Sequence, residues 1–215
     1  MSLNVRGLRD DRAALVRLLR ENAPDVVALQ EPPRGPFAGS RLRRVARAAD
    51  LRVAVAGHGS RTTALLVRAD EPPVPGRSVR LPRAGGRVRR GAVLADLRGV
   101  RVVGVHLGLH AAERQDHVRR VLALVREAPG PCVVAGDLNE SPAGTAARRL
   151  TAVLRDAAAG AGPTYPARDP AHRIDVVLVS PGIVVESAAV LRGPDASSAS
   201  DHLPVVVDLR IGERR

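Results

Sequence analysis

The stretch PCVVAGDLNESP, at residues 131–142, joins a run of small and β-branched residues to a cluster of polar ones. An apolar run of this length, bounded by proline and glycine, is typical of a buried β-strand. Asp137 and Asn139 stand where this strand ends and a turn begins. A rigid strand that carries acidic and amide side chains to its end is a common framework for an active site.

The same arrangement recurs along the chain, where polar residues lie at the ends of several other apolar runs. They are Asn4 after a short first strand, Glu31 after DVVALQ (25–30), His106 after VRVVGV (100–105), Asp175 at the start of DVVLV (175–179), and Asp201 with His202 before LPVVVDL (203–209). No single pair is diagnostic, but the repetition predicts that these side chains meet at one edge of a sheet.

The remaining pattern alternates short strands with helices. Amphipathic spacing predicts helices over 11–22, 40–50, 113–127 and 143–155, the first capped by Asp10 or Asp11. Further strands are expected at 51–56, 62–68, 91–98 and 100–107, with the last two forming a hairpin about Gly99. Residues 70–90 and 160–170 are predicted to be loops, and a shorter apolar piece covers 183–191.

This order mixes hairpins with strand–helix–strand units, which indicates an α/β fold with mixed sheets and helices outside. There is no internal repeat and no linker long enough to divide the chain. We therefore expect one domain over residues 1–215.

Composition narrows the class of protein. The apolar fraction of 45% and charged fraction of 26% in 215 residues exclude wholesale disorder and a disulfide-stabilised miniprotein. The single cysteine, Cys132, is expected in the core. No apolar run reaches the roughly 18–20 residues of a membrane span, and the N-terminus lacks a secretory signal, so a cytoplasmic location is expected. No obligate protein partner is indicated.

The charge favours an anionic partner. The net charge is +12, and all 34 basic residues are arginines, whose planar guanidinium groups suit phosphate. Part of the arginine count is also what a GC-rich coding sequence would produce. One Phe, one Tyr and no Trp provide no platform for stacking bases. These features favour nucleic acid or another phosphoester as the substrate.

The residue types indicate metal-dependent phosphoester hydrolysis. Asn4, Glu31 and Asp201 are hard oxygen donors that suit Mg²⁺ or Mn²⁺. A zinc site would contain more histidine or cysteine ligands.

The other polar residues suit proton transfer and charge stabilisation. Asp137 with Asn139 would orient and deprotonate a water for in-line attack. His106 and His202 would donate hydrogen bonds to the pentacovalent phosphorane or protonate the leaving oxygen. Asp175 would fix the tautomer of His202 and raise its pKa.

Six segments in this order resemble the motifs of the endonuclease/exonuclease/phosphatase superfamily, which includes deoxyribonuclease I and exonuclease III-type enzymes. They are SLNVRGL (2–8), PDVVALQE (24–31), VVGVHLGL (102–109), VVAGDLNESP (133–142), HRIDVVLVS (172–180) and SDHLPVVVDL (200–209). The resemblance spans almost the whole chain, and the GDLN and SDHLPV motifs are the most specific.

This resemblance implies a four-layered α/β sandwich, in which two mixed sheets pack face to face with helices outside. It also implies the following roles: Asn4 and Glu31 at the Mg²⁺ site, Asp201 near the metal and phosphate, Asp137 with Asn139 activating water, Asp175 with His202 as a carboxylate–histidine pair, and His106 on the phosphate. The chain would be a minimal bacterial member.

Two departures from the family pattern bear on function. Only Met1 to Leu3 precede Asn4, so the first strand is expected to be truncated, with Asn4 held less firmly. The segment between Gly108 and Gly136 is too short for the tyrosine-bearing loop of abasic-site endonucleases, and the sole tyrosine, Tyr165, lies elsewhere in the sequence.

Several residues outside these motifs have a simpler interpretation. His58, His110, His117 and His172 are expected on the solvated surface. The arginines of residues 77–90 are expected to be solvated as well, with contact to a polyanion backbone as the alternative. Arg114 and Gln115 either support the phosphate site or form a solvated helix end.

The main hypothesis is a Mg²⁺-dependent phosphodiesterase that hydrolyses nucleic acid by in-line attack of an activated water. One alternative is a hydrolase of a small or lipid phosphoester, similar to sphingomyelinases or inositol phosphatases. Another alternative, from a different class, is a catalytically weak module that binds polyanions.

Overall fold

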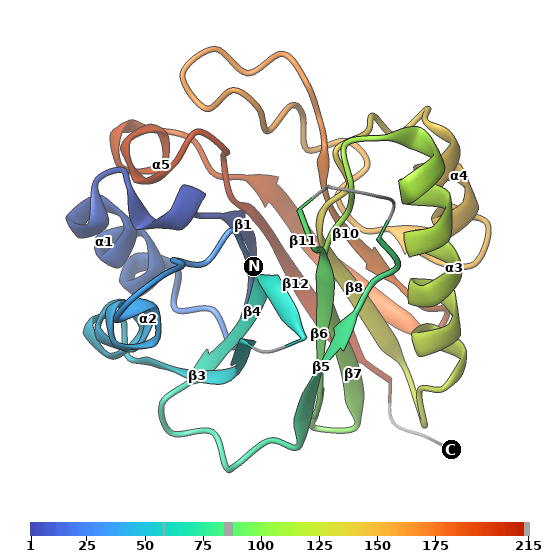
Figure 1. The fold of residues 1–215 in the computed structure, drawn as a ribbon, viewed down its shortest axis with the longest axis horizontal. Helices are drawn as coiled ribbons and strands as arrows, with labels where there is room; N and C mark the ends of the chain where they lie inside the picture. The colour runs from blue at the N-terminus through green and yellow to red at the C-terminus, as the bar shows by residue number, and fades with distance from the viewer. Residues whose placement is uncertain (58, 84–87, 213–215) are drawn as a thin grey trace.

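Two six-stranded mixed β-sheets pack face to face, with helices on both outer faces (Figure 1). This computed structural model describes residues 1–57, 59–83 and 88–212. Helices α1, α2 and α5 lie on one side of the sheets, and α3 and α4 lie on the other (Figure 1). The architecture confirms the α/β sandwich that the sequence predicts. His58 and Arg87, both predicted on the surface, lie outside the described residues.

The two sheets have the following strands. The first sheet, in spatial order, contains β11 (Ile183–Val190), β12 (Val205–Ile211), β1 (Ser2–Asn4), β2 (Val26–Gln30), β4 (Ser60–Arg68) and β3 (Leu51–Gly57). The second contains β5 (Gly76–Arg80), β6 (Gly91–Leu97), β7 (Val100–His106), β8 (Cys132–Asp137), β10 (Asp175–Val179) and β9 (Arg155–Asp156).

Five α-helices and a 3₁₀ turn are present in the described part of the chain. They are α1 (Arg12–Asn22), α2 (Ala38–Ala48), α3 (Ala111–Arg126), α4 (Thr145–Thr151), α5 (Pro194–Ala199) and the 3₁₀ turn Arg6–Leu8. Asp11 caps α1 as predicted, because its carboxylate accepts hydrogen bonds from the N–H groups of Ala13 and Ala14. None of the helices described is long and apolar enough to cross a membrane.

The pairing of the strands places the polar residues together. Strands β1 and β2 are parallel, and so are β7 and β8, so that the C-terminal ends of each pair lie side by side. His106 is in register with Asp137 across β7 and β8, and Asp175 is in register with Asp137 across β10 and β8. The hairpin of β6 and β7 is confirmed, with Gly99 at φ +80° in its turn.

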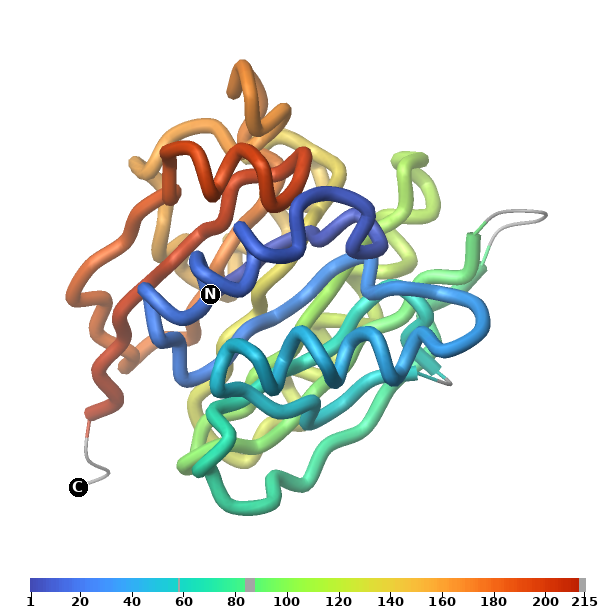
Figure 2. Tube along the Cα trace, turned by 90° about the vertical axis from the view of Figure 1, so that its left-hand side faces the viewer, coloured from blue at the N-terminus to red at the C-terminus, as the bar shows by residue number. Residues whose placement is uncertain are grey.

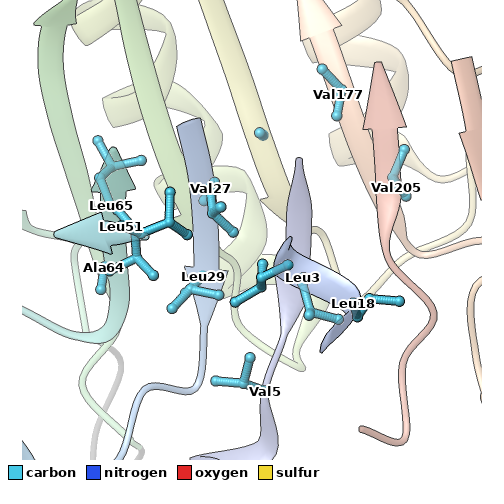
Figure 3. Close-up of a cluster of buried hydrophobic side chains, with 14 of the residues drawn as sticks. Leu3, Val5, Leu18, Val27, Leu29, Leu51, Ala64, Leu65, Val177 and Val205 are labelled. Atoms are coloured by element: carbon cyan, nitrogen blue, oxygen red, sulfur yellow. The ribbon is translucent and has the colours of Figure 1, made fainter. Parts of the chain in front are cut away.

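One cluster of buried apolar side chains packs on both faces of the first sheet and keeps these strand ends rigid. Figure 3 shows Leu3 of β1 and Leu29 of β2 within this core, and both are at most 2% exposed. Burial of a leucine side chain contributes about 2 kcal/mol, so the two inner strands are held by packing as well as by hydrogen bonds. The short β1 is entirely buried and pairs with β2 at each of its three residues.

The structure corrects two predictions and adds one helix that the sequence did not indicate. Residues 70–90, predicted as a loop, contain β5, because Val79 is buried and the segment pairs with the edge of β6. The predicted helix over 143–155 ends at Thr151, and β9 follows at Arg155–Asp156. Helix α5 was not predicted, because its sequence PDASSA has no apolar periodicity.

Candidate active site

The ends of β1, β7 and β8 and the start of β10 bring five polar side chains together. These are Asn4, His106, Asp137, Asp175 and His202, each no more than 6% exposed. His202 comes from the turn before β12, so the cluster draws on both sheets. Burying a polar group lowers the stability of the fold unless the group is paired. Hydrogen bonds within this cluster supply such partners.

Asp137 is the centre of the cluster. Its Oδ1 accepts a hydrogen bond from the backbone N–H of Asn139 at 2.8 Å, and its Oδ2 accepts one from Asn4 Nδ2 at 3.3 Å. Burial, together with the nearby charge of Asp175, raises the pKa of Asp137 to about 7. A carboxyl group with this pKa can accept a proton near neutral pH, whereas an ordinary aspartate is a much weaker base.

Asn139 holds this arrangement through its backbone conformation. Its φ of +51° lies in the left-handed region, which asparagine adopts more readily than most residues. Its side-chain Nδ2 donates a hydrogen bond to the carbonyl oxygen of Leu107, 2.9 Å away, at the end of β7. Asn139 therefore ties the turn after β8 to the neighbouring strand and aims its own N–H at Asp137.

His202 lies beside Asp175 in a buried ion pair. Its Nδ1 donates to Asp175 Oδ2 at 2.9 Å, and its Nε2 lies 4.0 Å from Asp137 Oδ2. Burial opposes a charge on the imidazole, but the hydrogen bond to Asp175 and the surrounding carboxylates outweigh it and raise the pKa of His202 to about 9. His202 is therefore a cation at neutral pH, able to donate a hydrogen bond from Nε2.

Thr164 supports this pair from the loop between β9 and β10. Its hydroxyl donates to Asp175 Oδ2 at 2.6 Å, and the side chain is fully buried. The other carboxylate oxygen, Asp175 Oδ1, is buried and has no hydrogen-bond partner among the described residues. Thr164 was not identified from the sequence, because threonine in a loop carries no signal of its own.

His106 has the opposite electrostatic environment. Its Nε2 lies 3.4 Å from Asp137 Oδ2, and Arg90 Nη1 lies 2.8 Å from both of its ring nitrogens. Burial and the charge of Arg90 lower the pKa of His106 well below its ordinary value. The two histidines therefore differ at neutral pH, since His106 is neutral and His202 is charged.

Glu31 and Asp201 lie at the border of the cluster. Glu31 follows β2 with φ +50°, and it lines a cleft beside the cluster. Asp201 precedes His202, and its Oδ2 lies 3.3 Å from Arg6 Nε. The amide oxygen of Asn4 accepts a hydrogen bond from the backbone N–H of Arg6 at 3.0 Å. The second lone pair of that oxygen is available to a cation.

Comparison with known proteins shows the family of the chain. The family model described as Endonuclease/Exonuclease/phosphatase family matches residues 1–202. The chain belongs to this family. Its members are generally phosphoester hydrolases and are typically dependent on a divalent metal. No curated protein shows a significant sequence match to the chain.

Solved structures of the endonuclease/exonuclease/phosphatase family share the fold. The endonuclease/exonuclease/phosphatase from Bacteroides vulgatus aligns with a TM-score of 0.81 and 20% identity, covering 98% of this chain and 97% of that one. The mannosyl-6-phosphatase Bt3783 from Bacteroides thetaiotaomicron aligns with a TM-score of 0.78 and 17% identity, covering 98% of both chains. An AP endonuclease from Archaeoglobus fulgidus has a TM-score of 0.71 and 16% identity, with 98% of both chains covered. At these identities, the likeness establishes the fold alone.

The donor set fits the divalent cation that the endonuclease/exonuclease/phosphatase family implies. Asp137, Asp175 and His202 offer ligand atoms within 4.8 Å of one another. Of these, the charged His202 is a poor ligand, because metals bind neutral imidazole. The remaining donors in and beside the cluster are oxygens of carboxylates and an amide, the ligands that Mg²⁺ and Mn²⁺ prefer. A cation there would also offset the repulsion between the buried carboxylates of Asp137 and Asp175.

Tyr165 lies beside the site, which the sequence did not indicate: its ring contacts that of His202, with centroids 4.8 Å apart. The β9–β10 loop carries it there, as it carries Thr164. His117 was expected at the surface, but it is fully buried, accepting from the N–H of Gly108 and donating to the carbonyl oxygen of Pro82.

Arg90 also departs from the expectation of a solvated arginine segment, because it is only 8% exposed and contacts His106. Arg114 is bound within the protein. Its Nε donates to Glu140 Oε2 at 2.9 Å, and its Nη1 donates to the carbonyl oxygens of Gly108 and Leu109. A role of Arg114 in substrate binding stays a prediction.

Proposed function

We propose that the protein is a Mg²⁺-dependent phosphodiesterase that hydrolyses nucleic acid. The observation that carries this proposal is the buried cluster in which a carboxyl with a pKa of about 7, Asp137, lies between a neutral and a charged histidine. Such a set can accept a proton from water and donate hydrogen bonds to a phosphate at the same pH. The net charge of +12 favours a polyanionic substrate.

In the proposed reaction, Asp137 accepts a proton from a water molecule while the water oxygen forms a bond to phosphorus. The backbone N–H of Asn139 and the amide of Asn4 hold the carboxylate in position for this step. The bond from phosphorus to the leaving oxygen breaks, that oxygen takes the electron pair, and solvent protonates it.

The spacing of the side chains supports a role of His202 at a non-bridging phosphate oxygen. Its Nε2 is 4.0 Å from Asp137 Oδ2. The leaving group in an in-line displacement lies on the opposite side of phosphorus from the attacking water, so a group this close to the base faces the equatorial oxygens. His202, as a cation, and His106, as a neutral donor, would stabilise the charge that develops there.

Asn4, Glu31 and Asp201 would hold the divalent cation, with Asp137 adjacent. When bound, a cation of this kind neutralises charge on the phosphate and on the leaving oxygen. Asp175 and Thr164 would act by positioning His202. Asp175 contacts the imidazole at Nδ1, and Thr164 contacts Asp175.

A substrate panel tests the proposal. Wild-type protein and the Asp137→Ala variant would be given supercoiled plasmid, single-stranded oligonucleotide, abasic-site duplex, mannose 6-phosphate and sphingomyelin, each with Mg²⁺, Mn²⁺ or EDTA. We expect metal-dependent cleavage of nucleic acid that the variant lacks. We also expect kcat/KM to fall steeply with salt concentration, because phosphate contacts release counterions.

The other outcomes separate the alternatives. Preference for mannose 6-phosphate or sphingomyelin with little salt dependence would support a hydrolase of small or lipid phosphoesters instead. Nucleic-acid binding without hydrolysis of any substrate, by a folded protein, would support the binding module. Either result would overturn the proposed nuclease.

A further inference from the structure

A cleft lined by arginines lies directly beside the catalytic cluster. It has a volume of about 580 Å³, and among the described residues that line it Glu31 is the only acidic one. The arginines lining it, called the arginine cleft below, are Arg6, Arg9, Arg12, Arg34, Arg41 and Arg90. They come from the turn after β1, the start of α1, the β2–α2 connection, α2 and the residue before β6.

A second cavity, of about 310 Å³, continues this surface. It shares Arg34 and Val88 with the arginine cleft and adds three more arginines, Arg61, Arg83 and Arg89. Figure 2 shows the β2–α2 connection and the described residues just before β6, 88–90, at the same end of the molecule. The positive surface is therefore continuous along this side of the site.

Most of these guanidinium groups are not neutralised within the protein. In the described part of the chain, no ion pair joins Arg9, Arg12 or Arg34 to a carboxylate, while Arg6 pairs with Asp10 and Asp201. By contrast, arginines elsewhere form close pairs, such as Arg17–Asp195, Arg68–Asp70, Arg101–Asp96 and Arg173–Asp156. Arginines that converge without counter-charges repel one another, and an anion between them relieves that repulsion.

Arg41 and Arg90 add a half-buried and a buried side chain to the cleft. Arg41 donates to the backbone carbonyl of Arg34 through Nη2, while its Nε is buried with no hydrogen-bond partner among the described residues. Arg90 is 8% exposed, and its contact is a histidine ring, not a carboxylate. A buried donor without a partner is rare in proteins, and an anion in the cleft would offer Arg41 Nε an acceptor.

Arg90 connects the cleft to the reacting centre. Its Nη1 lies 2.8 Å from the ring of His106, whose Nε2 lies 3.4 Å from Asp137 Oδ2. The cleft is thus contiguous with the position where the scissile phosphate would sit. An anionic group attached to that phosphate would reach the arginines without leaving the surface.

We propose that the arginine cleft is a second phosphate-binding site, which takes a phosphate group of the substrate next to the scissile one. This inference rests on the proposed function, in which the second phosphate is the neighbouring one of a nucleic-acid strand. Guanidinium groups bind phosphate through paired, charge-assisted hydrogen bonds, and the cleft offers several such groups around one space. The protein would therefore prefer substrates with at least one phosphate beyond the one it cleaves.

Paired substrates test this preference. Thymidylyl-thymidine, which has a single phosphate, would be compared with the same dinucleotide carrying an extra phosphate at its 5′ or its 3′ end. We expect kcat/KM to be higher for one of the phosphorylated forms by about tenfold, as for one charge-assisted contact. Fructose 6-phosphate and fructose 1,6-bisphosphate make the corresponding pair for the alternative function, a hydrolase of small phosphoesters.

Variants locate the effect. Arg9 and Arg34 are exposed, so the double substitution Arg9→Ala, Arg34→Ala removes two cleft arginines without opening the core. The matched control is Arg44→Ala, Arg47→Ala, which removes the same charge from exposed positions of α2 outside the cleft. We expect the ratio of kcat/KM between phosphorylated and unphosphorylated dinucleotide to approach one in the cleft variant and to stay at the wild-type value in the control.

Binding in EDTA provides a second readout that does not depend on catalysis. Fluorescence anisotropy with a labelled oligothymidylate of eight nucleotides should show that the cleft variant binds at least about tenfold more weakly than the control. Equal ratios for wild type and cleft variant, or equal weakening by both variants, would overturn the second site. Loss of binding only in the cleft variant, with no substrate hydrolysed, would retain the site and reject the proposed enzyme. A preference confined to fructose 1,6-bisphosphate would retain the site and reject nucleic acid.

Discussion

The hydroxyl of Thr164 offers a sharp test of how the histidine of the site is positioned. It donates to Asp175 Oδ2 at 2.6 Å inside the protein, and Asp175 in turn accepts from His202 Nδ1. Thr164→Val keeps the shape of the side chain and removes this donor. A hydrogen bond to a charged group contributes about 1.5–3 kcal/mol, and burial prevents water from replacing it.

We expect the upper part of that range for the loss in the free energy of unfolding, about 2–3 kcal/mol. The reason is that Asp175 Oδ1 already lacks a partner among the described residues, so the carboxylate would retain only His202. The looser carboxylate should also lower kcat about tenfold, which corresponds to about 1.4 kcal/mol in the barrier. Thr164→Ser is the control, because it restores the hydroxyl, and it should recover most of kcat.

Urea denaturation in EDTA and the kcat for bis-p-nitrophenyl phosphate with Mg²⁺ measure the two effects separately. A valine variant that loses stability but keeps the wild-type kcat would refute the reasoning, since Asp175 would then not need Thr164 to hold His202. Equal loss of kcat in the valine and serine variants would refute it too, because the hydroxyl would not be the cause.

Three further predictions concern residues that lie outside the chemistry. Burial lowers the pKa of His117, so the unfolded chain binds a proton more readily than the folded chain, and the free energy of unfolding should fall as pH drops below about 6.5. In urea denaturation, His117→Gln should reduce this slope by up to about 1.4 kcal/mol per pH unit, with His110→Gln at an exposed position as the control variant. A Cβ on Gly136, at φ +154°, would lie 1.9 Å from a carbonyl oxygen of β7, so Gly136→Ala should lower the free energy of unfolding by more than about 4 kcal/mol or prevent folding. Gly160→Ala is the control, because a Cβ there meets open space, and it should cost less than about 0.5 kcal/mol. Burial raises the pKa of Cys132 to about 12, so mass spectrometry should find no iodoacetamide adduct at pH 8 until urea unfolds the protein, and rapid labelling of the native protein would contradict the structure.

Strand positions were predictable because buried strands require apolar, β-branched residues in short runs. The ends of those runs at Asn4, His106 and Asp137 are also where the structure ends β1, β7 and β8. Register then follows from pairing, which is why residues from distant parts of the sequence meet in one cluster. These features depend on local composition and on the general geometry of sheets.

What the sequence did not reveal depends on loop paths and on the partner of each segment. Strand β5 forms because the edge of β6 is available to it, although its own sequence contains glycine and arginine. Tyr165 and Thr164 reach the site because their loop returns over β10, and no local pattern encodes that path. Arg90 is buried against His106. The arginine-rich sequence around it predicted a solvated side chain, because a contact with a distant residue leaves no local pattern.

The most direct test of the central claim is the hydrolysis of bis-p-nitrophenyl phosphate by wild-type protein and Asp137→Asn, with Mg²⁺, with EDTA, and with Mg²⁺ restored after EDTA. Asparagine nearly matches the size of aspartate but cannot accept the proton of the attacking water. The account predicts that wild-type hydrolysis requires Mg²⁺ and returns when Mg²⁺ is restored, and that the folded variant is slower by about a thousandfold. Hydrolysis that persists in EDTA, or a variant as fast as the wild type, would contradict it.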